Sequence, residues 1–126
     1  MSALSDKSRE RLSTCHPDLE RLFKEVSRRW PCQVLCGHRG QDEQERHFRE
    51  KKSKVRFPLS KHNAFPSLAA DVAPDPLDWS DARRFYYFAG YVRRVAEELG
   101  ISIRFGGDWD GDLAVKDQNF NDLVHF

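Results

Sequence analysis

The chain has 126 residues, the length of a single domain with one modest hydrophobic core. Its 21 Lys and Arg residues nearly balance its 20 Asp and Glu residues, so the formal net charge of +1 points neither to nucleic acid nor to an acidic membrane surface. We expect neither a membrane span nor a signal peptide, because no run of about 18 apolar residues occurs and no apolar segment follows the N-terminal charges.

The first half of the chain predicts two helices and a strand. Apolar residues at helical spacing predict an amphipathic helix over 17–30, with Pro17 in its first turn and Pro31 after its end. The apolar run at 33–37 is typical of a strand. The polar segment 40–52 has acids early and bases late, which favours a shorter exposed helix.

The second half predicts a long core helix between short strands. Segment 68–73 is strand-like, and 78–100 carries an apolar stripe that ends at a glycine, as a core helix does. We expect further strands over 101–106 and at the C-terminus, separated by the Gly/Asp loop 106–112. This order predicts one α+β domain over 1–126, with a small antiparallel sheet and flanking helices.

The cysteines and one basic segment each allow two interpretations. The three cysteines form an odd set, which favours reduced thiols in a protein made in a cytosol. Cys32 and Cys36 could supply two zinc ligands, but a structural site needs two more and only His38 lies nearby, so buried thiols are simpler. Segment 51–58 carries four bases and no acid, and we prefer a solvated loop to a polyanion-binding track.

Two histidines and an aspartate are candidates for a catalytic metal site. His62 and Asp71 lie nine residues apart across a turn, and His125 lies near the chain end. Such a donor set suits zinc with an open fourth position. Asp71 is the most informative residue, because a carboxylate in an apolar strand must be paired or metal-bound, although a salt bridge to arginine would also serve. Asp122, three residues before His125, is a candidate general base.

Several segments together resemble a known peptidase family. The segment SKHNAFPSLAADVAP (60–74) is similar to the S-x-H and A-x-D signature of the M15 metallopeptidases, in particular small phage endolysins and related L-alanyl-D-glutamate and D-alanyl-D-alanine peptidases. HPDL (16–19) resembles the start of the family's first helix, and GHRGQDEQ (37–44) resembles its Gly-x-Arg and Gln segment. FGGDWDGD (105–112) and DLVHF (122–126) are similar to its last two motifs, in family order.

The resemblance implies a Hedgehog/DD-peptidase-like fold and a role for each matching residue. Arg39 would polarise the scissile carbonyl or hold a substrate carboxylate, as a permanently charged planar group can. Ser60 and Gln44 would orient the ligands by hydrogen bonds. The implied zinc ligands are His62, Asp71 and His125, and the implied catalytic base is Asp122.

The resemblance also implies a substrate and a route to it. We expect a monomeric, zinc-dependent peptidase that cleaves peptidoglycan stem peptides, made in the host cytoplasm and reaching the cell wall through a holin-type pore. The L-Ala–D-Glu bond is the expected target, because Arg39 is the one motif-matched cation and no export signal is visible. The alternatives are a D-Ala–D-Ala carboxypeptidase, a noncatalytic zinc-containing wall-binding module, which Asp122 and Arg39 disfavour, and a nucleic-acid binder acting through 51–56.

Two departures from the family pattern bear on the site. Relatives commonly carry a Glu two residues after the last histidine, whereas this sequence ends at Phe126. The terminal carboxylate could replace that Glu or could crowd the site. Relatives often have an aromatic residue where His38 precedes Arg39, and the role of His38 stays open.

Overall fold

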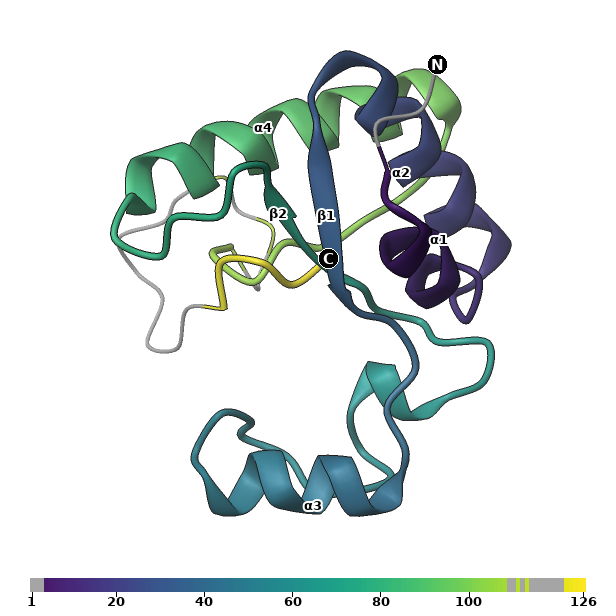
Figure 1. Cartoon of the computed structure of the whole chain (residues 1–126), viewed down its shortest axis with the longest axis vertical. Coiled ribbons are helices and arrows are strands. Elements are labelled where there is room, and N and C mark those ends of the chain that lie inside the picture. Colours follow the sequence, from purple (N-terminus) through teal and green to yellow (C-terminus); the bar gives the residue numbers. More distant parts are fainter. Residues whose placement is uncertain (1–3, 109–110, 112, 114–121) are drawn as a thin grey trace.

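Two strands and the last residues of the chain form a small sheet against a layer of helices (Figure 1). The computed structural model describes residues 4–108, 111, 113 and 122–126. In chain order the elements are α1 (Asp6–Leu12), α2 (Pro17–Arg29), β1 (Cys32–Cys36), α3 (Gln41–Arg49), the 3-10 turn η1 (Lys61–Asn63), β2 (Asp71–Pro74) and α4 (Ala82–Leu99). No helix in this part of the chain is long and apolar enough to cross a membrane.

Strand β2 is the middle of three aligned segments. It pairs antiparallel with β1, and a bulge between Val34 and Cys36 places Cys36 opposite Asp71. On its other edge, Ala70 and Phe126 exchange two backbone hydrogen bonds of 2.9 Å, and Asp71 forms an antiparallel bridge with His125. Asp71 therefore has a neighbour on each side, Cys36 on one strand and His125 on the other.

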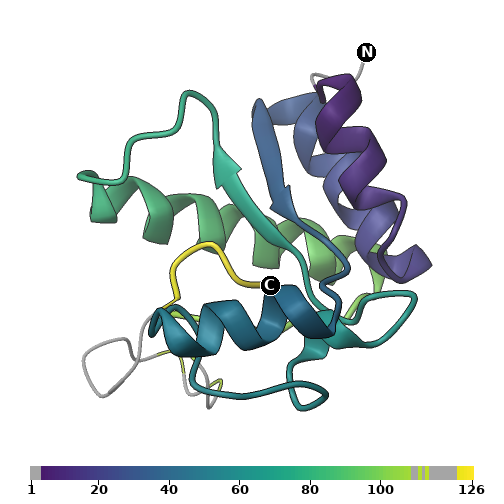
Figure 2. The same ribbon diagram turned by 60° about the horizontal axis from the view of Figure 1, so that its bottom comes forward.

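The core lies between this sheet and the helices α2 and α4. Helix α4 crosses behind both strands, and α1 and α2 lie together beside β1 (Figures 1 and 2). The apolar stripes of α2 and α4 supply much of the core, including Phe23, Phe88 and Val92. Phe126 joins it, 3% exposed, with its ring 5.5 Å from that of Phe23. Burial of this aromatic side chain fixes the C-terminal segment that carries His125.

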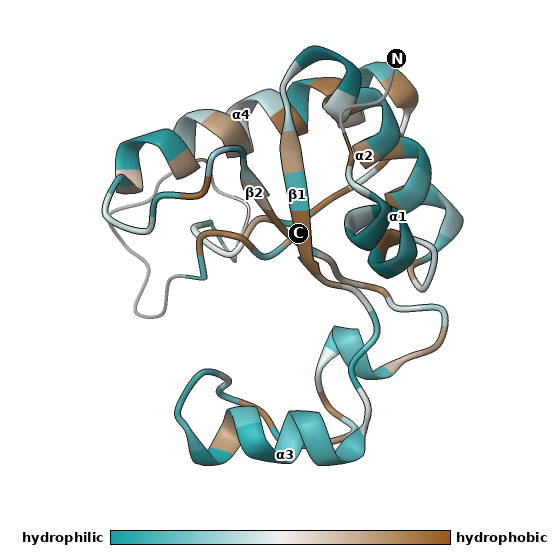
Figure 3. Ribbon diagram, in the orientation of Figure 1, coloured by the Kyte–Doolittle hydropathy of each residue, from teal (hydrophilic) through white to brown (hydrophobic). Residues whose placement is uncertain are grey.

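Helix α3 and turn η1 form an arm beyond the end of the sheet. Figure 1 shows them below the strands, joined to β1 and β2 by two neighbouring segments. Helix α3 is hydrophilic along most of its length (Figure 3), and Gln44 is its buried residue. Helix α3 therefore has no apolar face to pack against the sheet, and the polar contacts of Gln44 hold it in place.

The structure confirms the α+β class and most of the predicted elements. Helix α1 was not predicted; its N-cap is Ser5, whose side chain accepts a hydrogen bond from the Ser8 amide. The strand predicted over 101–106 is wrong. Residues 101–104 form no ladder, and Phe105 makes an isolated bridge with Asp108, because the free edge of β2 is taken by the C-terminus. Ile101 and Phe105 are apolar because they pack into the core.

The predicted C-terminal strand is only partly present. Among residues 122–126, a bridge forms at His125, and the Val72 amide donates to the Val124 carbonyl at 2.8 Å. Much of the Gly/Asp loop predicted over 106–112 lies outside the described residues, which include 106–108 and 111.

Candidate active site

Asp71 is the centre of a buried cluster of polar side chains. Its Oδ1 lies 3.2 Å from His62 Nε2 and 3.6 Å from His125 Nδ1. Its Oδ2 lies 3.4 Å from an Arg39 nitrogen. Burial opposes ionisation of this carboxyl group, but its hydrogen bonds with His125 and His62 hold the pKa of Asp71 well below its usual range. The group is therefore an anion with three basic neighbours.

His62 is held by contacts on both ring nitrogens. Its Nδ1 lies 2.7 Å from the Gly37 carbonyl oxygen, which can only accept, so Nδ1 carries a proton and Nε2 faces Asp71. Burial works to lower the pKa of His62, but hydrogen bonds with Asp71 and Cys36 outweigh it and raise the pKa to about 10. A ring fixed in this way by a backbone carbonyl is the usual arrangement of a metal-ligating histidine.

Turn η1 sets the position of His62 along the chain. The Ser60 hydroxyl accepts from the His62 amide at 3.2 Å, and the Asn63 side chain accepts in return from the Ser60 amide at 3.0 Å. This reciprocal capping box explains why a serine two residues before the histidine belongs to the pattern. Ser60 acts on the backbone of His62 and not on its ring.

Arg39 is buried inside the cluster and is 5% exposed. One terminal nitrogen donates to Gln44 Oε1 at 3.0 Å, and the other lies 3.4 Å from Asp71 Oδ2 and 3.7 Å from Cys36 Sγ. Its Nε has no hydrogen-bond partner among the described residues. In this geometry the guanidinium orients Asp71, while its buried Nε–H makes no hydrogen bond with the described residues.

Gln44 connects the arm to the sheet. Its side chain is 0% exposed, its oxygen accepts from Arg39 and from Asn63, and its Nε2 donates to Ser53 Oγ at 2.9 Å and to the Val55 carbonyl at 2.7 Å. All four hydrogen-bonding positions of the amide are used. Gln44 thus supports Arg39, which in turn supports Asp71.

Asp122 lies beside His125, with its Oδ2 4.0 Å from His125 Nδ1. Burial raises its pKa, and the nearby charge of Asp71 raises it further. Gly106 makes this placement possible, because a Cβ at this position would lie 2.0 Å from the Asp122 carbonyl oxygen. The Asp122 amide donates to the Gly106 carbonyl at 2.9 Å, so this glycine clamps the segment that carries both Asp122 and His125.

Cys36 is a neighbour of the site that the sequence did not reveal. The ligand atoms of Cys36, His62 and Asp71 lie within 4.8 Å of one another, as do those of Asp71, Asp122 and His125. The two sets share Asp71, and the rings of His62 and His125 are 5.2 Å apart. The structure therefore places His62 and Cys36 in one donor set with Asp71, and His125 and Asp122 in the other.

The alternative in which Cys32 and Cys36 bind one zinc ion is wrong. The two residues occupy opposite ends of β1, and four residues of extended strand span about 13 Å. Cys32 is in the core. His38 also points elsewhere: its Nδ1 lies 3.0 Å from the Ala64 carbonyl oxygen, and its ring packs edge-on against Phe65.

Comparison with known proteins identifies the family of the chain. A model of the phage L-alanyl-D-glutamate peptidase family matches residues 1–126. The chain belongs to the phage L-alanyl-D-glutamate peptidase family. It is 27% identical over 108 residues to the L-alanyl-D-glutamate peptidase of Escherichia phage T5, an alignment that covers 82% of this chain and 78% of that protein.

A solved structure shows that the similarity extends to the fold. The L-Ala D-Glu endopeptidase ChiX of Serratia marcescens matches with a TM-score of 0.70 and 29% sequence identity. The match covers 96% of this chain and 85% of that one. The expected resemblance to phage L-alanyl-D-glutamate peptidases is thus confirmed.

Proposed function

We propose that this chain is a zinc-dependent endopeptidase of the M15 type that hydrolyses the L-Ala–D-Glu bond of peptidoglycan stem peptides, and that it serves as a phage endolysin. The observation that carries the proposal is the pair of contacts from Asp71 to His62 and His125, with Asp122 next to His125. Family membership and the printed activities of both similar proteins support the choice of bond.

The donor chemistry of the cluster fits zinc. Two imidazoles approach the Asp71 carboxylate, which belongs to both groups of close donor atoms: Cys36, His62 and Asp71 in one, and Asp71, Asp122 and His125 in the other. The proposed ligands are drawn from both groups. We propose that His62, Asp71 and His125 hold the ion. A bound Zn²⁺ would supply Lewis-acid activation of water and of the scissile carbonyl. Cys36 is a fourth donor nearby, and we assign it no ligand role because the three predicted ligands already complete a catalytic set.

Asp122 is the proposed general base. Its raised pKa brings its proton affinity closer to neutrality than that of an ordinary aspartate, which suits a group that must accept and then release a proton. Asp122 takes a proton from the attacking water as the water oxygen bonds to the carbonyl carbon. It then delivers a proton to the leaving nitrogen as the carbon–nitrogen bond breaks, which leaves a new carboxylate and a new amine.

Arg39 and Gln44 are proposed to preorganise the site. The guanidinium fixes one Asp71 oxygen, and Gln44, which is held by three other hydrogen bonds, accepts one hydrogen bond from the guanidinium. Because both terminal nitrogens of Arg39 are engaged and its Nε is buried, we propose that Arg39 acts on the reaction by orienting Asp71.

We propose that the enzyme is a monomer and has no nucleic-acid partner. Bases in 51–56 have acidic partners: Arg56 pairs with Glu45 and Lys52 pairs with Glu50. This pairing weakens the segment as a polyanion-binding track. We propose that the enzyme is made in the host cytoplasm and reaches the wall through a holin-type pore.

The test combines metal removal with a base-removing variant. Protein stripped by a chelator, then reloaded with Zn²⁺, is assayed on purified peptidoglycan for newly released amino groups. Activity should vanish on stripping and return with zinc, and Asp122→Asn should lose about 10²- to 10⁴-fold in rate while binding zinc. Asp42→Asn, at an exposed acid of α3, is the matched control. Full activity in stripped protein, or an Asp122→Asn rate within about threefold of wild type, would refute the proposal.

A further inference from the structure

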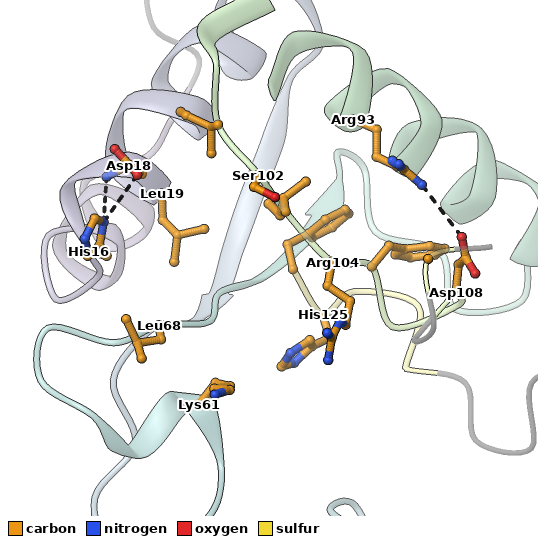
Figure 4. A pocket seen from close by; sticks show the side chains of 15 residues that line it. His16, Asp18, Leu19, Lys61, Leu68, Arg93, Ser102, Arg104, Asp108 and His125 are labelled. Atoms are coloured by element: carbon orange, nitrogen blue, oxygen red, sulfur yellow. Dashed lines mark hydrogen bonds and ion pairs between the residues drawn. The ribbon is translucent and has the colours of Figure 1, made fainter. Parts of the chain in front are cut away.

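A cavity of about 610 Å³ begins at His125 and extends away from the buried cluster. It runs between the start of α2, the segment 101–105 and helix α4 (Figure 4). Among the proposed site residues that the structure describes, His125 lines this cavity. The cavity is therefore placed to receive the part of a substrate that lies next to the scissile bond.

Two exposed cations in this cavity have no acidic partner within the described residues. Lys61 and Arg104 make no ion pair and no side-chain hydrogen bond among the described residues. By contrast, Arg93 lies 3.7 Å from Asp108. In Figure 4, Lys61 and Arg104 lie toward His125, whereas His16 and Asp18 lie together at the other end of the cavity. The end nearest the proposed zinc site is thus positively charged.

The chemistry of the proposed substrate matches this charge. In an L-Ala–D-Glu bond the amine of D-Glu belongs to the scissile amide. D-Glu has two carboxyl groups, and only one of them can continue the stem peptide. The other is free and lies within one residue of the bond that is cut. A substrate of this class therefore brings an anion to the immediate neighbourhood of the reacting carbonyl.

We propose that Arg104, together with Lys61, binds this free carboxylate and thereby makes the enzyme specific for D-Glu on the leaving side of the bond. This inference rests on the proposed function. Arg39 is not available for the same task in the present geometry, because its terminal nitrogens are engaged by Gln44 and Asp71. Arg104 is the better anchor of the pair, since a guanidinium can hold a carboxylate through two parallel hydrogen bonds.

The experiment compares two synthetic substrates that differ only at this group. One contains L-Ala–D-Glu with the free carboxylate, and in the other that carboxylate is an amide. Both substrates are assayed with wild type, Arg104→Gln and Lys61→Gln. The control is Arg83→Gln, because Arg83 is an exposed arginine of α4 that does not line the cavity. We expect Arg104→Gln to lower kcat/KM about 10- to 100-fold on the carboxylate substrate, mainly through KM, and to leave the amide substrate nearly unchanged.

The remaining outcomes separate this inference from the proposed function. If Arg104→Gln and Lys61→Gln lose the same factor on both substrates, or lose nothing on either, the carboxylate assignment is wrong while the peptidase stands. If wild type cleaves both substrates equally well, the assignment is also wrong. If wild type cleaves neither, the proposed function fails and the inference fails with it. Partial recovery of the carboxylate preference in Arg104→Lys would support a charge contact.

Discussion

Replacing Gln44 with leucine tests how far the site depends on the arm formed by α3 and η1. The substitution keeps a similar volume at a position that is 0% exposed, and it removes hydrogen bonds to Arg39, Asn63, Ser53 and Val55. The Arg39 donor would be left buried without its Gln44 partner, whereas the Val55 carbonyl would keep a hydrogen bond from Ser53 Oγ at 3.1 Å. Such losses are more costly than the loss of a solvent-exposed hydrogen bond.

The expected destabilisation follows from the number and type of these bonds. Neutral hydrogen bonds contribute about 0.5–1.5 kcal/mol each, and one to a charged group about 1.5–3 kcal/mol. Burial of the leucine offsets about 1–2 kcal/mol of the loss. We therefore expect Gln44→Leu to lower the free energy of unfolding by about 3 kcal/mol, and to reduce activity because Arg39 no longer holds Asp71 in place.

Urea unfolding followed by circular dichroism measures the first effect, with Gln41→Leu as the control. Gln41 lies three residues earlier in α3 and is exposed, so its replacement should change stability by less than about 0.5 kcal/mol. If Gln44→Leu stays within about 1 kcal/mol of wild type at an unchanged urea slope, the network does not hold the arm. If it unfolds as expected but keeps full activity, Gln44 is structural and does not position the site.

Two further predictions concern the metal ligands and the glycine clamp. Zinc content, measured by mass spectrometry of the purified proteins, should fall to near zero in His62→Ala and His125→Ala. It should stay near one ion per chain in Cys36→Ser. Loss of zinc in Cys36→Ser alone would instead favour the ligand set of Cys36, His62 and Asp71. Gly106→Ala should cost about 2 kcal/mol or more and most of the activity, because its Cβ would overlap the Asp122 carbonyl. Gly90→Ala is the control: a Cβ on Gly90 of α4 would meet open space, so this change should stabilise the protein by about 0.5–1 kcal/mol. If thermal unfolding gives Gly106→Ala and Gly90→Ala the same change in Tm, Gly106 does not clamp the Asp122 segment.

The helices could be predicted because their signals are local. Helix α2 carries apolar residues at helical spacing between two prolines, and α4 ends at Gly100, which adopts the left-handed conformation with φ of 71°. Helix α1 was missed because it is a single short segment of mostly charged residues, held by its cap and by contact with β1. Segment 101–105 was mistaken for a strand because apolar residues that pack one by one into the core look like a strand when their partners are unknown.

The candidate site was predictable in its composition and not in its geometry. His62, Asp71, His125 and Asp122 were proposed from residue types and from the family resemblance, and in the structure the other three lie near Asp71 in two donor sets. The position of Cys36 depends on the bulge that sets it opposite Asp71, and strand register of this kind is not visible in the residues themselves. The burial of Arg39 and the two cations of the cavity likewise follow from how distant segments pack.

Fragment masses from a peptidoglycan digest test the central claim most directly. Purified Gram-negative peptidoglycan is treated with the zinc-loaded protein, and the soluble products are separated and weighed. Cleavage between L-Ala and D-Glu predicts stem peptides that begin at D-Glu, with L-Ala left on the glycan strand. Release of free D-Ala alone, with every L-Ala–D-Glu bond intact, would contradict the account and would identify a carboxypeptidase instead.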